Sequence, residues 1–327
     1  MASSPMQYIW PGIIGAQAIH AAAKLRIPDL LASGPRSIVE LAADSGADAA
    51  ALDRLLRALS TLGMFALSAD GRFSNTPLTD VLRTDHPQSQ RDAALFLPAA
   101  FLWRPLGELY ESVSTGEPVF PRIFGQRFFE YLATHPDDAA VFNAVMTQGV
   151  AFTSPALLAA YDFSRLERLV DVGGGEGALL RDILSATPGL RGVLFDLPQV
   201  VLGAGEVLNG DLRARCQIVA GDFFHSVPEG ADAYIMKGVI HDWPDEDAAR
   251  ILGNTRRAIL KDGTLLLVEN MADATSRPVG VIDLLMLVIG GRERTEADFR
   301  TLLSGAGFAI NRIIHMEASS LIECRPV

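Results

Sequence analysis

The sequence has few cysteines, no long uninterrupted apolar run and no excess of positive charge, and each shortage excludes a class of protein. Its only two cysteines, Cys216 and Cys324, are too few for a disulfide framework or a cysteine-ligated structural metal site, so no metal is expected. The longest apolar candidate, residues 279–289, is shorter than the ~20 residues needed to cross a bilayer and contains Asp283. The first residues lack the charged segment and apolar core of a secretory signal, so a cytoplasmic location is expected.

The charge balance excludes two kinds of partner. The formal net charge is −11, and such a chain is repelled by phosphate backbones and by anionic lipid. We therefore expect neither a nucleic-acid nor a membrane partner. With 327 residues, of which 49% are hydrophobic and 20% charged, the chain is long enough for two globular domains.

The first ninety residues predict a mainly helical, winged-helix-like unit. Between residues 33 and 80 there are four basic and six acidic residues, so the net charge of this region is negative, which is the wrong sign for a DNA-binding module. Packing or dimerisation is the better interpretation. The expected elements are a helix over 9–27 that stops before Pro28, helices over 37–43 and 49–62, and a hairpin over 65–76.

The rest of the chain changes character twice. Residues 91–160 carry many aromatic side chains on helix-like segments, and a few of these are expected to line an apolar pocket. From residue 161 onward, strands alternate with helices, which predicts an α/β domain with a doubly wound parallel sheet. The predicted strands cover 168–172, 192–195, 216–220, 233–239 and 264–269, with helices over 179–186 and 245–260.

The last two strands break the parallel pattern. Residues 308–316 and 319–324 are β-type runs separated only by Glu317 and Ala318, which is too short for a crossover helix. They must form an antiparallel hairpin at the sheet edge. A Rossmann-like sheet that ends in such a hairpin is typical of class I methyltransferases.

A glycine-rich turn predicts a nucleotide-like cofactor. The run LVDVGGGEG over 169–177 is an apolar strand that turns into a helix, and glycines let the backbone approach a ligand closely. Gly173, Gly175 and Ala178 also satisfy a dinucleotide fingerprint, so this run alone leaves the cofactor open. Asp196, at the end of the next strand, is placed to accept bonds from ribose hydroxyls in either case.

A second motif, MKGVIHDWPDED over 236–247, lies at the carboxyl end of the fourth predicted strand. In an open α/β sheet, ligands bind beyond these strand ends, so both motifs should face one crevice. His241 is the only histidine in a strand-end motif. An imidazole beside a cofactor loop predicts an enzyme.

The glycine-rich run, the His241 motif and four further runs resemble the S-adenosylmethionine-dependent small-molecule O-methyltransferases, a family with plant caffeate-type and bacterial polyketide and antibiotic members. The four further runs are LFDLPQV, AGDFF, LLLVEN and GGRERTEADFRTLLSGAGF. The matching runs cover essentially all of residues 165–310, and the N-terminal unit agrees with the same family. The resemblance implies S-adenosylmethionine as cofactor and a homodimer that interleaves N-terminal helices. The implied cofactor-binding residues are Gly173, Gly175, Asp196, Leu197, Asp222, Phe223, Lys237 and Trp243, the last with simple core packing as its alternative.

The resemblance also implies the chemistry. His241 is the expected general base, and Glu269 is the acid expected to bond the histidine. Glu293 is expected as a second acid at the pocket, or else as the partner of Arg292 or Arg294.

The expected acceptor is a phenolic or enolic hydroxyl on an apolar small molecule. Phe142, Met146 and Met286 match pocket positions of the family. The segment MLVIGGRERT lacks a polar asparagine found in plant members, which disfavours a small hydroxycinnamate-like acceptor. The alternatives are another reaction on the same fold and cofactor, such as N-methylation, decarboxylation or a pericyclic rearrangement, and an NAD-dependent oxidoreductase.

Overall fold

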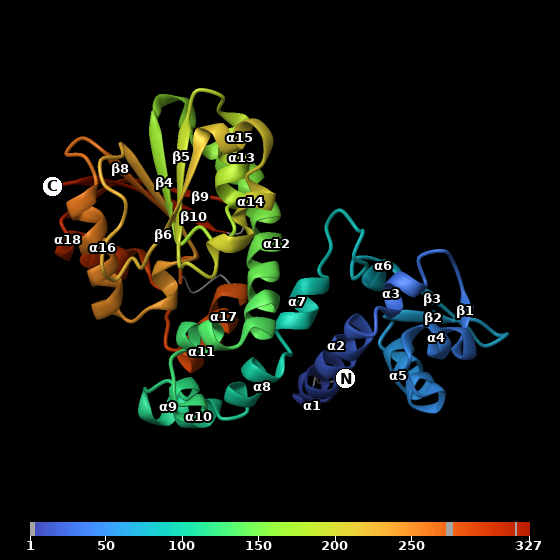
Figure 1. Ribbon diagram of the computed structural model, residues 1–327. Coiled ribbons are helices and arrows are strands. Elements are labelled where there is room, and N and C mark those ends of the chain that lie inside the picture. Colours follow the sequence, from blue (N-terminus) through green and yellow to red (C-terminus); the bar gives the residue numbers. More distant parts are fainter. Residues whose placement is uncertain (1–3, 273–276, 318) are drawn as a thin grey trace. The chain divides into compact units, whose positions relative to one another are not determined.

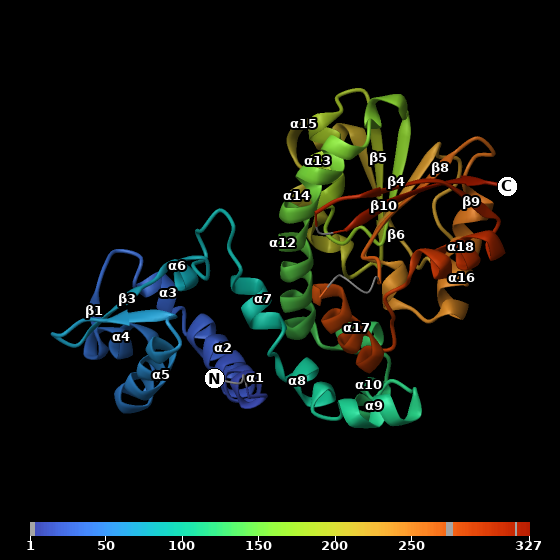
Figure 2. The same ribbon diagram turned by 180° about the vertical axis from the view of Figure 1, so that it is seen from behind.

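The protein, described here from a computed structural model, forms two compact units, Met1–Arg104 and Pro105–Val327. The structure describes residues 4–272, 277–317 and 319–327. Figures 1 and 2 show the units from opposite sides, with the first unit in blue to cyan. Helix α8 (Ala100–Leu106) runs from the first unit into the second. The expected three-part division, with boundaries near residues 90 and 160, stays a prediction.

The first unit is a small helical domain with a three-stranded sheet. Its core is formed by leucines of α4 and α5 together with Phe65 and Phe73, which are almost fully buried. The predicted hairpin is present as β2 and β3, and β1 adds a strand on the other side of β3. The elements are α1 (Met6–Trp10), α2 (Ala16–Lys24), α3 (Ile27–Leu30), β1 (Arg36–Ser37), α4 (Ile38–Ser45), α5 (Ala49–Thr61), β2 (Phe65–Leu67), β3 (Arg72–Asn75), α6 (Pro77–Asp80) and α7 (Arg91–Phe96).

The first helix differs from its prediction over 9–27. Helical structure begins earlier, at Met6, passes through a π-helical turn at Pro11–Gly15 and ends at Lys24. Arg26 adopts a left-handed conformation with φ 56°, which stops the helix before Pro28 is reached. Pro28 then lies in the first turn of α3, where its missing N–H costs nothing.

The second unit begins with helices that carry most of the aromatic side chains. Phe120, Phe124, Phe128 and Tyr131 pack ring against ring in this region. The helices are α9 (Leu109–Thr115), α10 (Phe120–Phe124), α11 (Phe128–Thr134) and α12 (Pro136–Ala160).

Helix α12 corrects one expectation from the sequence. By length and composition alone, it is long and apolar enough to cross a membrane. The expectation that no segment meets that criterion is therefore wrong. A single helix of this kind is weak evidence for a membrane protein, and α12 packs against α13 within the second unit.

The large sheet has the predicted topology. Its strand order is β6-β5-β4-β7-β8-β10-β9, in which the first five strands are parallel and β10 runs antiparallel to both β8 and β9. The expected terminal hairpin is confirmed, although Ala318 of its connection lies outside the described residues. The strands are β4 (Arg168–Val172), β5 (Arg191–Asp196), β6 (Cys216–Ala220), β7 (Ala233–Lys237), β8 (Thr264–Glu269), β9 (Phe308–His315) and β10 (Ser320–Pro326).

Helices cover both faces of this sheet (Figures 1 and 2). Successive strand residues point to opposite faces, so Leu265 and Leu267 pack with α16 and α18, whereas Leu266 and Val268 pack with α13. The central strands are buried on both sides, which explains their continuous apolar runs. The remaining helices are α13 (Ala178–Ala186), α14 (Ala204–Val207), α15 (Gly210–Arg215), α16 (Asp245–Ala258), α17 (Arg277–Ile289) and α18 (Glu296–Gly305).

Strand β7 is shorter than predicted, and the difference shapes the crevice. It ends at Lys237 and not at residue 239, because Gly238 has φ 60° and turns the chain away from the sheet. The turned chain forms a short 3-10 turn at Ile240–Asp242, immediately before α16. This turn places His241 beyond the carboxyl end of β7.

Candidate active site

The glycine turn after β4 takes the form that the sequence predicts. Gly173 and Gly175 have φ values of 68° and 62°, a region that favours glycine. A Cβ on Gly173 would lie 2.9 Å from Cγ2 of Val239, so this turn touches the strand end that leads to His241. A Cβ on Gly175 would meet nothing within 4 Å, so the backbone faces open space there.

Asp196 lies against this glycine turn from the neighbouring strand. Its Oδ2 accepts a hydrogen bond from the Gly175 amide at 2.8 Å, and its Oδ1 accepts one from the Leu197 amide at 2.7 Å. Burial raises the pKa of Asp196 to about 6, although both amide bonds oppose the shift. A buried carboxylate beside an open glycine loop suits a ligand that offers hydroxyl donors.

The next strand end supplies Asp222 and Phe223. Asp222 remains 38% exposed, and it accepts hydrogen bonds from the Phe224 amide at 2.8 Å and from His225 Nδ1 at 3.0 Å. The Phe223 ring would come within 3.6 Å of a Cβ on Gly173, so it borders the glycine turn. Phe223 therefore lies beside the glycine turn, and Asp222 precedes it in the chain.

Trp243 belongs to an aromatic cluster. Its ring stacks on Phe129 with centroids 5.2 Å apart, and the guanidinium of Arg127 lies 5.0 Å from its centroid. Phe223 and Phe224 meet it edge-on at 5.9 and 4.6 Å. The residue is 7% exposed, so it is largely packed, and its expected contact with an adenine stays a prediction.

Two charged groups lie at the ends of adjacent strands in the centre of the sheet. Asp171 on β4 is buried, and its Oδ2 has no hydrogen-bond partner among the described residues. Burial raises the pKa of Asp171 to about 7, the Asp196 charge adds to the shift, and Lys237 opposes it. Burial lowers the pKa of Lys237, against the opposing charge of Glu269. Asp171 is not among the site residues expected from the sequence.

This distribution of charge fits S-adenosylmethionine, which carries a positive sulfonium and an ammonium group. An unpartnered buried carboxylate oxygen is costly unless a cation or a donor reaches it. Asp171 and Asp196 are both next to the glycine turn, and a bound cation would favour their ionised forms. The residues present are thus suited to a cationic nucleoside.

His241 meets one of its two expected acids directly. Its Nδ1 lies 2.9 Å from Oε1 of Glu293, and the imidazole is only 17% exposed. On its other side, Nε2 is 3.5 Å from Oδ1 of Asp242. The ring is thus held at Nδ1 by Glu293, and Nε2 has the Asp242 carboxylate nearby without a hydrogen bond of normal length.

The expected role of Glu269 needs correction. This residue was expected to bond the histidine, but Glu269 Oε2 lies 4.0 Å from His241 Nδ1, beyond a hydrogen bond. Its Oε1 instead accepts from the amides of Val239 and Ile240 at 3.2 and 2.8 Å. Because Glu269 ends β8 beside β7, it caps the chain that turns away after Gly238, and it acts on the imidazole through charge alone.

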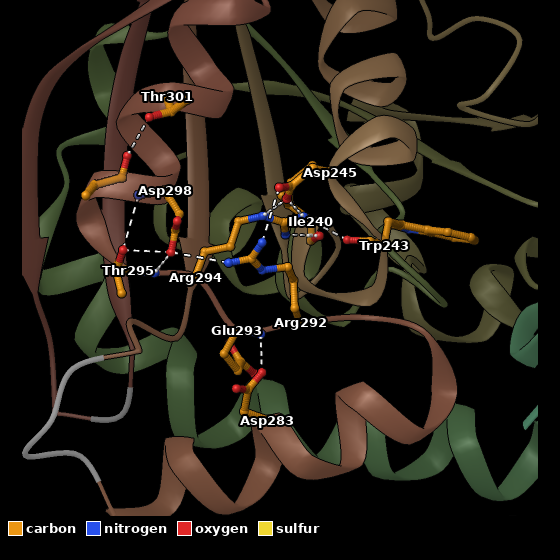
Figure 3. A network of polar contacts seen from close by, with 11 residues as sticks. Ile240, Trp243, Asp245, Asp283, Arg292, Glu293, Arg294, Thr295, Asp298 and Thr301 are labelled. Carbon is orange, nitrogen blue, oxygen red and sulfur yellow. Dashed lines mark hydrogen bonds and ion pairs between the residues drawn. The ribbon is translucent and has the colours of Figure 1, made fainter. Parts of the chain in front are cut away.

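Glu293 is held in place by groups other than its chain neighbours. Its amide donates to Oδ1 of Asp283 at 2.7 Å, as Figure 3 shows, and Asn270 Nδ2 donates to its Oε1 at 3.3 Å. Arg292 and Arg294 point away from it and pair with Asp245. The alternative in which Glu293 pairs with one of these arginines is therefore wrong.

The imidazole lies in a strongly negative setting. Burial lowers the pKa of His241, but the charges of Asp242 and Glu269 and the hydrogen bond with Glu293 outweigh burial and raise the pKa to about 10. Burial raises the pKa of Asp242 to about 7 and also raises that of Glu269. The surrounding carboxylates therefore favour the protonated form of His241.

The three expected pocket residues come from two helices. On α12, Phe142 packs edge-on against Phe128 and Phe129, and Met146 is 41% exposed. On α17, Met286 is 7% exposed, and its carbonyl accepts from the amides of the two glycines that precede Arg292. Their common role in an acceptor pocket stays a prediction.

The raised pKa of His241 can be tested without a substrate. We expect its imidazole to titrate well above the ordinary 6.5, and Glu293→Gln to lower that pKa because one carboxylate charge is removed. Stability gained from this shift is complete below pH 6.5 and is lost as the pH rises toward about 10. Nuclear magnetic resonance of histidine-labelled protein measures the shift, with the signal assigned by its loss in His241→Asn. An unshifted pKa in the wild-type protein would contradict the prediction.

Comparison with known proteins gives the family. Residues 103–309 match the O-methyltransferase domain, and residues 9–85 match the O-methyltransferase dimerisation domain. The chain is 40% identical to phenazine O-methyltransferase PhzM of Lysobacter antibioticus, over 95% of this chain and 92% of that protein. It is 37% identical to an 8-amino-8-demethylriboflavin N,N-dimethyltransferase of Streptomyces davaonensis, over 95% and 91% of the two chains.

Among solved structures, the chain resembles an O-methyltransferase from neocarzinostatin biosynthesis in complex with S-adenosylmethionine and 2-hydroxy-5-methyl naphthoic acid. The TM-score is 0.86 and the identity 34%, over 96% of each chain. The class I methyltransferase fold and the cofactor implied by the sequence motifs are thus confirmed. The chain belongs to the S-adenosylmethionine-dependent O-methyltransferase family and is an enzyme of that family.

Proposed function

We propose that this enzyme transfers a methyl group from S-adenosylmethionine to a phenolic or enolic hydroxyl of a flat, apolar small molecule, with His241 as general base. The observation that carries the proposal is the 2.9 Å contact between His241 Nδ1 and Glu293 Oε1 at the carboxyl end of the sheet. It holds the imidazole so that Nε2 is available to an acceptor. The same crevice contains the glycine turn after β4.

The proposed cofactor residues divide by the part of the nucleoside they suit. Asp196 and Leu197 would hold the ribose, the glycines would approach the methionine portion, and Asp222 and Phe223 would read the adenine. When bound, the cofactor supplies an electrophilic methyl group on a positively charged sulfur. The full proposed set is Gly173, Gly175, Asp196, Leu197, Asp222, Phe223, Lys237 and Trp243.

Proton transfer sets the pH dependence in this proposal. A phenol has a pKa near ~10, like tyrosine, so it is neutral at pH 7 and needs a base. His241 can act as that base only after losing its own proton, and its pKa is raised to about 10. The fraction of active enzyme should then rise with pH. The positive charge of the bound cofactor opposes protonation of a nearby imidazole and so favours the basic form.

The acceptor class is supported by the walls of the crevice and by the relatives. Phe142, Met146 and Met286 have apolar side chains without hydrogen-bonding groups, and we propose that they border the acceptor, which suits a flat ring system. The relatives are named for phenazine, mitomycin and naphthoate substrates. We propose that the acceptor of this enzyme is likewise a fused-ring metabolite with an ionisable hydroxyl, and that the enzyme works in the cytoplasm.

N-methylation is the second candidate, because two relatives at 37% and 34% identity are named as N-methyltransferases. An aromatic amine keeps a free lone pair at neutral pH and attacks without losing a proton first. Its methylation should therefore be insensitive to loss of the general base. The response of His241→Ala separates the two candidates on any acceptor that is found.

We also propose a homodimer formed through the N-terminal region, which matches a dimerisation family. Apolar side chains stay exposed on the first helix, with Tyr8 75%, Ile13 56% and Ile14 54% exposed. Such a surface is expected to be covered in an obligate dimer. Sedimentation should give twice the chain mass of 35.1 kDa, and Ile13→Glu with Ile14→Glu should shift it toward the single-chain mass. A wild-type monomer at micromolar concentration would contradict this.

Loss of the ribose carboxylate should weaken cofactor binding. Each charge-assisted hydrogen bond contributes ~1.5–3 kcal/mol, so Asp196→Ala should raise the Kd for S-adenosylmethionine by at least ~10-fold without unfolding the protein. Calorimetric titration measures the change, and Asp211→Ala, an exposed aspartate on α15, is the matched control. Equal affinity of the wild-type protein and Asp196→Ala would show that the cofactor lies elsewhere.

Loss of the base should affect turnover more than binding. We expect His241→Ala to reduce kcat by ~10²–10⁴, the range for a positioned base, with a Kd for S-adenosylmethionine close to wild type. The deficit should shrink as the pH approaches the pKa of the acceptor hydroxyl, where the nucleophile forms unaided. His86→Ala, in the first unit, is the control. Wild-type turnover of an un-ionised hydroxyl acceptor by His241→Ala would overturn the base assignment.

A further inference from the structure

A fully buried arginine holds the turn that carries His241. The Arg294 side chain has no exposed surface, although a guanidinium is costly to remove from water unless it is paired and hydrogen-bonded. Its Nη1 donates to the Ile240 carbonyl and its Nη2 donates to the Trp243 carbonyl, each at 2.8 Å, as Figure 3 shows. These two carbonyls flank the His241-Asp242 pair, so one rigid group spans the turn.

The turn depends on such outside donors because its own hydrogen bonds are long. The Asp242 amide is 3.3 Å from the Val239 carbonyl, and the Trp243 amide is 3.4 Å from the Ile240 carbonyl. Both distances exceed the usual range of 2.7–3.2 Å for an N–H···O bond. The bond from Arg294 to the Ile240 carbonyl is the shorter contact of that oxygen.

The residues before Arg294 fix the rest of the turn. The Arg292 amide donates to the His241 carbonyl at 2.8 Å, and Glu293 binds the imidazole. A Cβ on Gly291 would lie 2.3 Å from the same carbonyl, so only glycine lets the two segments approach this closely. Three consecutive residues thus hold the His241 turn by its carbonyls and its ring.

Arg294 also forms an ion pair, which gives it a competing structural role. Its Nε and Nη2 lie 3.0 and 2.8 Å from Oδ1 of Asp245 at the start of α16. The Asp245 side chain is 60% exposed, and pairs that reach solvent contribute little to stability. The planar guanidinium of a buried arginine is therefore needed for the two carbonyl contacts and not for the ion pair.

We propose that Arg294 is a positioning residue for the methyl-transfer reaction: by clamping the carbonyls on either side of His241, it aims the imidazole held by Glu293. The inference rests on the proposed role of His241 as general base. A lysine cannot replace the arginine, because its single ammonium cannot span both carbonyls in a fixed geometry. A misplacement of about 1 Å at a reacting group can cost ~10²-fold in rate.

The test compares Arg294→Lys, which keeps the charge, with Arg294→Gln, which keeps two donors without the charge. We expect kcat to fall by ~10–10²-fold in both, while the Kd for S-adenosylmethionine stays within about threefold. The acid limb of the kcat profile should move to lower pH, because a loosened Glu293 contact lowers the pKa of the imidazole. Asp245→Asn, which removes the carboxylate charge that pairs with both Arg294 and Arg292 but leaves the two carbonyl contacts, should cost less than about threefold, and Arg300→Lys on the surface of α18 should have no effect.

A double variant adds a readout that a purely structural role would not move. If both residues act on His241, the effects of Arg294→Lys and Glu293→Gln on kcat should be strongly non-additive. Additive effects would overturn the proposal, as would wild-type kcat and pH profile in a folded Arg294 variant. Failure of both Arg294 variants to fold, or an equal loss of cofactor binding, would assign the arginine to structure alone. Full activity of His241→Ala would instead contradict the proposed role of His241 as general base. An inactive His241→Ala together with a fully active Arg294→Lys would contradict only the proposed role of Arg294.

Discussion

The hydrogen bond between His241 and Glu293 joins segments that are 52 residues apart, and the chemistry of the crevice depends on it. The bond lies among buried carboxylates, because Glu269 and Asp242 are also within 4.0 Å of the ring. An imidazolium offsets this negative charge, which is why the pKa of His241 is raised. The same charge has a cost, since a base that is too readily protonated is inactive at neutral pH. With S-adenosylmethionine bound at the glycine turn, as we propose, its positive charge would oppose protonation of the imidazole.

Backbone geometry brings the two segments together. The turn at Gly238 ends β7 early and raises His241 out of the sheet, where it needs new hydrogen-bond partners. Those partners come from residues 291–294, which can approach only because Gly291 lacks a Cβ. Glu269 completes the arrangement from β8 by capping the Val239 and Ile240 amides. The site is therefore built from the ends of β7 and β8, the turn at Ile240–Asp242 and the segment before α18.

The sequence predicted much of this architecture, because apolar runs and glycine turns are local signals. Strands β4, β6 and β8 begin and end at the predicted residues, and the antiparallel hairpin follows from its short connection. The choice of acid was not predictable in the same way. Glu269 and Glu293 both follow apolar segments that converge on the crevice, and only the three-dimensional course of the chain decides which one reaches Nδ1. A pairing of Glu293 with an adjacent arginine also looked plausible from the sequence. In the folded chain, however, Glu293 points away from Arg292 and Arg294, so these neighbours reach different partners.

The proton-handling groups and the acceptor walls belong to different elements of the second unit. His241, Glu269 and Glu293 are fixed by the carboxyl ends of β7 and β8 and by the segment before α18. The proposed walls instead come from α12 and α17, where Met146 remains 41% exposed. The side chains of Phe142, Met146 and Met286 make no hydrogen bond to the imidazole among the described residues, although Asp283 of α17 holds the Glu293 amide. With the proposed walls and the imidazole's carboxylate partners on different elements, the shape offered to an acceptor and the hydrogen bonds of the imidazole depend on different side chains.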